Sequence, residues 1–275
     1  MKNKLDSLFF TRLFVSQAPQ SSPDRKTESE IQFAIPSTLS VCGMEIIMKK
    51  LQQKFLVALP ALVYMTIYLI WFYLLEHMHG RHYTIIHMRA DDKIPFCELF
   101  IVPYLLWFGY VAWILIYLLF TNTRDFHKCC SFLFSGMTVF LIVSTLFPNM
   151  HYLRPYIMPR NNFFCDLVTH LYRIDTSTNL WPSIHVYNSL GVLFAVMHND
   201  RLGTNKWIKW GCFTLSLSII LSTMFLKQHS VFDVMTAFIM AAVVYIVVYR
   251  TEILSNLRHS YEEHQKRKEK ETQWF

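Results

Sequence analysis

The sequence predicts an all-α, polytopic membrane protein with six transmembrane helices. Hydrophobic residues make up 53% of the 275 positions and charged residues only 16%, whereas a soluble domain carries about 25% charged residues. The mean hydropathy is positive, at +0.27. The apolar residues also gather into runs of roughly 17 to 25 residues, the length that crosses a bilayer. Composition and spacing together indicate that lipid surrounds most of this chain.

The six apolar runs are separated by polar connections of unequal length. We expect spans at residues 55–75, 98–120, 129–147, 185–197, 207–226 and 231–249, the fourth beginning at Ser183 or His185. Residues 149–180 form the longest connection. A connection of this length is more often functional or partly structured than an unstructured loop. We therefore expect one or two short helices in it, lying along the membrane interface.

Polar segments flank the membrane domain. Residues 1–43 are predicted to be a disordered tail, because residues 17–30 are polar, rich in Pro and Ser and without apolar periodicity. Residues 44–250 form the predicted six-helix domain. Residues 251–275 form a basic and polar tail.

The net charge of +7 is explained by the membrane rather than by nucleic acid. Much of the excess lies beside the apolar spans, at Lys49, Lys50, Lys54 and residues 266–270. Flanking cations set topology and contact anionic headgroups. The short turns at 121–128 and 198–206 are also basic, so the positive-inside rule predicts that they lie in the cytoplasm. We expect the host membrane to be the plasma membrane. Nucleic acid is excluded as a partner, and the sequence carries no indication of oligomeric state.

Cysteine and histidine patterns do not favour a metal site. The six cysteines include no C-x-x-C pair and lie mostly within or beside apolar spans, as small apolar residues do. Four histidines follow the first span and leave a metal site as an alternative to an interfacial loop: His77, His79, His82 and His87. They lack a carboxylate or cysteine at matching spacing, so we expect no metal and no cofactor.

Two polar segments, each directly before an apolar run, contain the candidate catalytic residues. We call residues 179–185 the first island and residues 227–233 the second island. In the second, His229 and Asp233 are four residues apart and share one helix face. The aspartate can accept the Nδ1 proton of the imidazole and leave Nε2 nucleophilic. His229 could therefore attack phosphorus, although a polar pair that only closes a helix end remains the structural alternative.

The first island has the features of a helix start that binds an anion. Ser183 follows Pro182 and can cap a helix, leaving free backbone N–H groups at its positive end. A phosphate fits such a terminus. His185, one turn in, could protonate a leaving alcohol as general acid; an interfacial histidine is the alternative. Arg154 and Lys227 are the candidate cations that would bind the phosphate oxygens. The alternative is that each extends its charged group to the membrane interface.

These residues together resemble a known family. The motifs are Arg154-Pro155, then Pro182-Ser183-Ile184-His185, then Ser222-Thr223 followed by His229 and Asp233. Over residues 55–250 the chain is similar to the type-2 phosphatidic-acid phosphatase superfamily of integral membrane lipid phosphatases and phosphotransferases. The resemblance implies a six-helix bundle, a phosphohistidine at His229 with Asp233 as its partner, His185 as the acid, Ser222 in the phosphate site, and no metal.

The chain departs from the family pattern at three positions. Phe147 stands where a lysine is expected, Ile184 where a glycine is expected, and Thr223 where an arginine is expected. Lys227 could replace one lost cation, because it lies about one helical turn from Thr223. The Pro-Ser-aliphatic-His form resembles the branch that contains inositol-phosphoceramide and sphingomyelin synthases.

The function that we expect is hydrolysis of a lipid phosphate or pyrophosphate at the extracytoplasmic face through a covalent His229 intermediate. The substrate is a lipid phosphate, and the membrane is the environment. One alternative is a lipid phosphotransferase that uses an alcohol as acceptor. A second is a non-catalytic protein or transporter on the same fold, which Phe147 and Thr223 favour; the near absence of charged residues within the spans argues against transport.

Overall fold

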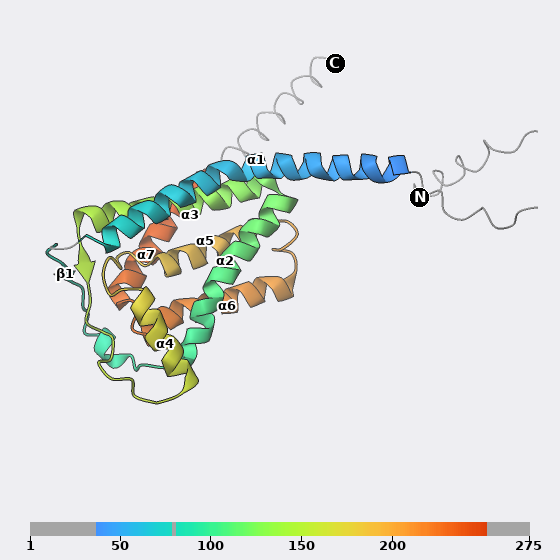
Figure 1. Ribbon diagram of the computed structural model, residues 1–275. Coiled ribbons are helices and arrows are strands. Elements are labelled where there is room, and N and C mark those ends of the chain that lie inside the picture. Colours follow the sequence, from blue (N-terminus) through green and yellow to red (C-terminus); the bar gives the residue numbers. More distant parts are fainter. Residues whose placement is uncertain (1–36, 79–80, 252–275) are drawn as a thin grey trace, which may run out of the picture. The chain divides into compact units, whose positions relative to one another are not determined.

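The computed structural model describes residues 37–78 and 81–251. Its helices are α1 (Ser37–Glu76), α2 (Ile101–Thr121), α3 (Thr123–Leu146), α4 (Phe163–Ile174), α5 (Ile184–His198), α6 (Lys206–Phe225) and α7 (Val231–Tyr245) (Figure 1). Shorter elements are the strands β1 (Thr84–Ile85) and β2 (Asn149–Met150), the 3-10 helices η1 (Asp91–Lys93) and η2 (Glu98–Phe100), and a π-helical turn η3 (Ile246–Arg250). The all-α prediction is confirmed.

The chain divides into two compact units, residues 1–49 and 50–275, and the helices that build the site belong to the second. Residues 37–43, which the sequence assigns to the disordered tail, are helical and open α1. The rest of the two predicted tails, residues 1–36 and 252–275, lies outside the described residues.

Five of the described helices are long and apolar enough to cross a membrane, so the chain is an integral membrane protein. They are Ile47–Glu76, Glu98–Thr121, Thr123–Leu146, Lys206–Phe225 and Val231–Arg250. The predicted fourth span is the shorter helix α5, whose 15 residues extend about 22 Å, less than the ~30 Å of a hydrocarbon core. Eleven of those residues are buried among α2, α3, α6 and α7. Because protein rather than lipid surrounds α5, it does not need the full spanning length.

Helix α3 begins at Thr123, ahead of the predicted start at Cys129. The Asn122 side-chain oxygen accepts the backbone N–H groups of Arg124 (3.1 Å) and Asp125 (3.2 Å), which caps the helix there. The predicted turn at 121–128 is therefore mostly the first two turns of α3, and the connection between α2 and α3 narrows to Asn122 alone.

Close packing of α3 on α5 anchors the centre of the bundle. Phe132 stacks on Tyr187 with 4.7 Å between ring centroids, and the Tyr187 hydroxyl donates to the Phe132 carbonyl over 2.7 Å. A Cβ at Gly136 would lie only 2.1 Å from the Tyr187 ring. Glycine at this position is what lets the ring lie against α3, and α5 is thereby held with its first turn at the site.

The connections at the end of the bundle that carries the two islands are tied to one another. Strand β1 pairs in parallel with β2, which the sequence does not predict, while α4 is the short helix expected in residues 149–180. Glu76, the last residue of α1, accepts from the Asn179 side chain (2.8 Å) and from the Thr176 hydroxyl. These contacts hold the first island over the bundle.

Candidate functional site

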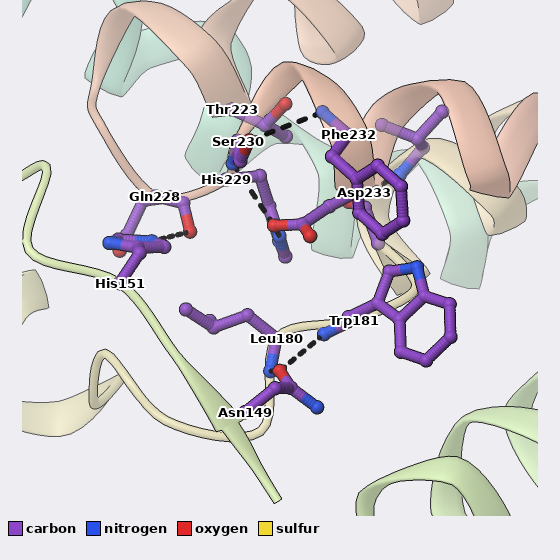
Figure 2. Close-up of polar contacts among 12 residues, drawn as sticks. Asn149, His151, Leu180, Trp181, Thr223, Gln228, His229, Ser230, Phe232 and Asp233 are labelled. Atoms are coloured by element: carbon purple, nitrogen blue, oxygen red, sulfur yellow. Dashed lines mark hydrogen bonds and ion pairs between the residues drawn. The ribbon is translucent and has the colours of Figure 1, made fainter. Parts of the chain in front are cut away.

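The two islands meet, as the sequence predicts. The Ser183 N–H donates to the Asp233 carbonyl over 3.4 Å, and the rings of His185 and His229 lie 5.7 Å apart between centroids. Figure 2 shows His229 and Asp233 pointing toward one another. Residues more than 40 positions apart thus form one cluster, in which two imidazoles face each other from α5 and from the turn before α7.

His229 and Asp233 form a buried pair at the start of α7. Ser230 caps α7, and Asp233 completes a capping box by accepting the Ser230 N–H over 3.0 Å. The same Oδ2 atom of Asp233 accepts from His229 Nδ1 over 3.4 Å. His229 is 5% exposed and Asp233 is fully buried. A carboxylate at Nδ1 leaves Nε2 of His229 without a proton, which is the tautomer that a nucleophile needs.

The backbone also fixes His229. Its N–H donates to the Thr223 carbonyl at the end of α6 over 3.0 Å, and the Gln228 N–H donates to the same carbonyl over 2.9 Å. Thr223, where the resemblance leads us to expect arginine, therefore shapes the turn through its main chain, while its hydroxyl donates to the Ile220 carbonyl over 2.8 Å.

His185 lies in the first turn of α5, which Ser183 caps as predicted. The Ser183 Oγ atom accepts the Val186 N–H over 3.4 Å. The His185 ring packs against Trp107 (4.4 Å between centroids) and Tyr104 (4.7 Å) of α2. Trp107 Nε1 is buried without a hydrogen-bond partner within residues 37–78 and 81–251.

Arg154 reaches the second island through Gln228. Its guanidinium donates to the Gln228 side-chain oxygen, to the Thr176 carbonyl (2.7 Å) and to the Tyr172 carbonyl (3.2 Å), and it lies 4.5 Å above the Tyr172 ring. Burial lowers the Arg154 pKa, an effect that Asp175 opposes, and the guanidinium stays charged. Its Nε atom is buried and has no hydrogen-bond partner among the described residues.

Gln228 and His151 are site residues that the sequence did not reveal. The Gln228 side chain is fully buried and lies between Arg154 and Asp175. Its oxygen accepts from Arg154, and its NH₂ group donates to Asp175 over 3.3 Å. His151 Nδ1 accepts the Leu153 N–H (3.3 Å), so Nε2 carries the proton and donates to the Gln228 carbonyl (2.8 Å; Figure 2). Burial lowers the His151 pKa to about 4, and the ring is neutral at pH 7.

Asn149 is a second residue whose role appears only in the structure. Its side-chain oxygen accepts the N–H groups of Leu180 (2.8 Å) and Trp181 (2.9 Å), as Figure 2 shows, and its own carbonyl accepts the Asn179 N–H (2.7 Å). Asn149 thereby fixes the backbone of the first island just before the cis Trp181–Pro182 peptide bond. No local sequence signal marks it, because its partners lie about 30 positions away.

Two residues predicted to bind phosphate direct their polar atoms elsewhere. The Ser222 hydroxyl is fully buried and donates to the Ile219 carbonyl within α6 over 2.6 Å. The Lys227 amine donates to the Asp91 carbonyl over 2.7 Å, and burial lowers the Lys227 pKa. Phe147, at the expected lysine position, lies with its ring 6.2 Å from that of Trp181. Arg154 is thus the predicted cation whose side chain bonds a side chain of the second island, that of Gln228.

Within the described ranges, no three His, Cys, Asp or Glu side chains are grouped closely enough to bind a metal ion. In the connection after α1, His87 instead bonds Asp92, with 2.8 Å between Nε2 and Oδ1. His79, part of the alternative metal site, lies outside the described residues. The five cysteines that the structure describes are free thiols.

The segment that carries both islands is similar to a known family. Residues 160–255 match the model of the PAP2 superfamily. The matched segment includes His185, His229 and Asp233 but begins after Arg154. No curated protein and no solved structure matches the chain. The PAP2 match agrees with the resemblance that the sequence motifs show.

Proposed function

We propose that the chain is a membrane-bound lipid phosphatase that works through a phosphohistidine at His229. One observation carries the proposal: a buried His229–Asp233 pair faces His185 across 5.7 Å within the PAP2 segment. Each imidazole alone could have a purely structural role, His229 at a helix end and His185 at the membrane interface. Two imidazoles on one site, one oriented by a carboxylate and one at a capped helix start, form a nucleophile and an acid for phosphoryl transfer.

In the first step, Nε2 of His229 attacks phosphorus. The N–P bond forms while the bond from phosphorus to the lipid oxygen breaks, and His185 gives its proton to the leaving alkoxide. Nδ1 of His229 keeps its proton and donates it in the hydrogen bond to Asp233, whose carboxylate stabilises the positive charge on the ring. In the second step, neutral His185 takes a proton from water, whose oxygen attacks phosphorus; the N–P bond breaks and inorganic phosphate leaves.

Arg154 and the start of α5 are the proposed phosphate site. The unpartnered Nε of Arg154 and the backbone N–H groups at the first turn of α5 can donate to phosphate oxygens. Ser183 contributes by capping that turn. Ser222 and Lys227 are not part of the proposed phosphate site, because both donate hydrogen bonds to backbone carbonyls.

The substrate is proposed to be a lipid because the site lies at one end of a bundle of apolar helices. The opposite end carries the basic residues Arg124, Lys128, Arg201, Lys206 and Lys209. The positive-inside rule assigns that end to the cytoplasm, which places the proposed active site on the extracytoplasmic face, most simply of the plasma membrane.

A second candidate is transfer of a phospho-headgroup from one lipid to the alcohol of another. The observation that favours it is the small number of cations at the site: Phe147 and Thr223 offer none, and the Lys227 amine is bonded to Asp91. A phosphodiester carries one negative charge and a phosphate monoester nearly two. The diester therefore needs fewer cations to bind.

Phosphate release tests both candidates. Purified protein in detergent with EDTA is given phosphatidate, a prenyl pyrophosphate, a sphingoid phosphate and a lipid phosphodiester, each with and without a lipid alcohol. We expect inorganic phosphate from the wild type, none from His229→Ala, and full release from His170→Ala, which alters an exposed histidine of α4. A new phospholipid without free phosphate would establish the transferase instead. Neither product from the wild type would refute both and favour a non-catalytic role.

A further inference from the structure

Asp91, in the connection between α1 and α2, accepts hydrogen bonds from the turn that carries His229. It is 2% exposed, and its carboxylate accepts from the Ser230 hydroxyl (2.7 Å) and the Val231 N–H (2.7 Å). Its carbonyl accepts from the Lys227 amine (2.7 Å). Asp91 therefore holds residues on both sides of His229, although it lies about 140 positions earlier in the chain.

The contact through Ser230 leads directly to the catalytic pair. The Ser230 hydroxyl donates to Asp91 and accepts the Phe232 N–H (3.2 Å), while the Ser230 N–H donates to Asp233 Oδ2 (3.0 Å). That Oδ2 atom is the one that accepts from His229 Nδ1. A shift of Ser230 would thus change how Asp233 meets His229.

The contact through Lys227 fixes the other end of the turn. Lys227 has a φ of 54°, in the left-handed region that a lysine rarely adopts. Its bond to the Asp91 carbonyl ties down this unusual residue two positions before His229. Asp91 itself is set by its own connection, because its carboxylate also accepts the Met88 N–H (2.8 Å).

From these contacts we propose that Asp91 is a positioning residue for the reaction at His229. It acts through Ser230 and Lys227 to keep the His229–Asp233 pair aligned with His185, and it does not touch the substrate. The catalytic part of this inference rests on the proposed phosphatase or transferase function. Lys227, expected from the sequence to bind phosphate, belongs to this positioning contact instead.

Asp92 provides a matched control. It is the next residue of the same short helix η1, it carries the same charge, and its side chain is 66% exposed with His87 as its partner. Asp91→Asn and Asp92→Asn remove one negative charge each from neighbouring positions. Only the first alters the contacts to the turn, because an amide would turn its NH₂ group toward one of the three donors that the carboxylate now accepts.

The test compares kcat and KM of the two variants with the wild type. We expect Asp91→Asn to lower kcat roughly 10- to 100-fold, since a small displacement of a reacting group is costly, with KM within about twofold and Asp92→Asn unchanged. Equal kcat values in all three proteins would overturn the proposal. A rise in KM alone would also overturn it, since it would assign the carboxylate to substrate binding.

A second measurement does not depend on activity. In protein labelled with ¹⁵N-histidine, the Nδ1–H signal of His229, assigned by its absence in His229→Ala, reports the bond to Asp233. We expect Asp91→Asn to lose or shift this signal and Asp92→Asn to retain it; an unaltered signal in Asp91→Asn would refute the positioning role. If the wild type shows no activity, the proposed function fails while this signal still decides the role of Asp91. If Asp91→Asn does not fold, Ser230→Ala breaks the same link and is expected to show the same loss.

Discussion

Replacing Asp233 by asparagine separates the two roles that this carboxylate has in the structure. Its Oδ2 atom accepts both the His229 Nδ1 proton (3.4 Å) and the Ser230 N–H (3.0 Å). An asparagine oxygen in the Oδ2 position can still accept from Ser230 and from His229. The negative charge that stabilises the positively charged His229 ring during the reaction is lost.

The expected magnitude follows from the lost charge on the acceptor of the His229 hydrogen bond. A hydrogen bond to a charged group contributes about 1.5–3 kcal/mol, and each ~1.4 kcal/mol of barrier is tenfold in rate. Asp233→Asn should therefore lower kcat roughly 10- to 150-fold. The free energy of unfolding should change by less than about 1 kcal/mol, because Ser230 still caps α7.

The assay is steady-state phosphate release with the best substrate of the panel, together with thermal unfolding of both proteins in the same detergent. Asp233→Ala, which loses both contacts, should be equally slow and less stable by about 1 kcal/mol. A kcat for Asp233→Asn within twofold of the wild type would refute the reasoning, since Asp233 would then be only the capping residue of α7.

Three further predictions concern the surroundings of the pair. Gln228→Ala should raise KM roughly tenfold by removing a hydrogen bond from the charged Arg154; a change in kcat alone would contradict this. Gly136→Ala should lower the unfolding temperature, with a cost of about 1–3 kcal/mol from the clash with Tyr187, whereas Gly109→Ala, with nothing within 4 Å of the added Cβ, should not. The pKa of His151 is about 4 in the folded protein against an ordinary 6.5, so the unfolded chain binds more protons between those values and stability falls as the pH drops through them. Between pH 7 and 5 this loss should be about 2 kcal/mol larger in the wild type than in His151→Gln, measured by thermal unfolding at both pH values; equal losses would show that His151 does not titrate this way.

The sequence reveals those parts of the fold that depend on local pattern. Apolar runs place α2, α5, α6 and α7 to within a few residues, and the Pro182-Ser183 pair gives the start of α5. Helix α1 begins at Ser37, well before the predicted start at residue 55. The early start of α3 also had a local signal: Asn122 with Asp125 three residues later is typical of a helix N-terminus. Hydropathy alone could not find it, because the first turns of α3 are polar.

What the sequence could not reveal depends on long-range contacts. Asp91, His151 and Asn149 are polar residues in connections, and each is typical of a solvated loop. Their roles come from partners more than 30 positions away, at Val231, Gln228 and Leu180. Lys227 is the reverse case, since its place in the chain favours a phosphate contact while its left-handed backbone and the Asp91 carbonyl direct its amine elsewhere.

The most direct test of the central claim is detection of the phosphoryl group on His229. The protein is mixed with the lipid phosphate, quenched in alkali, in which phosphohistidine survives, and digested for mass spectrometry. The account predicts one phosphoryl group on the peptide that contains His229, absent in His229→Ala and present in His170→Ala. Turnover without any phosphohistidine, or a phosphoryl group on His185 instead, would contradict it.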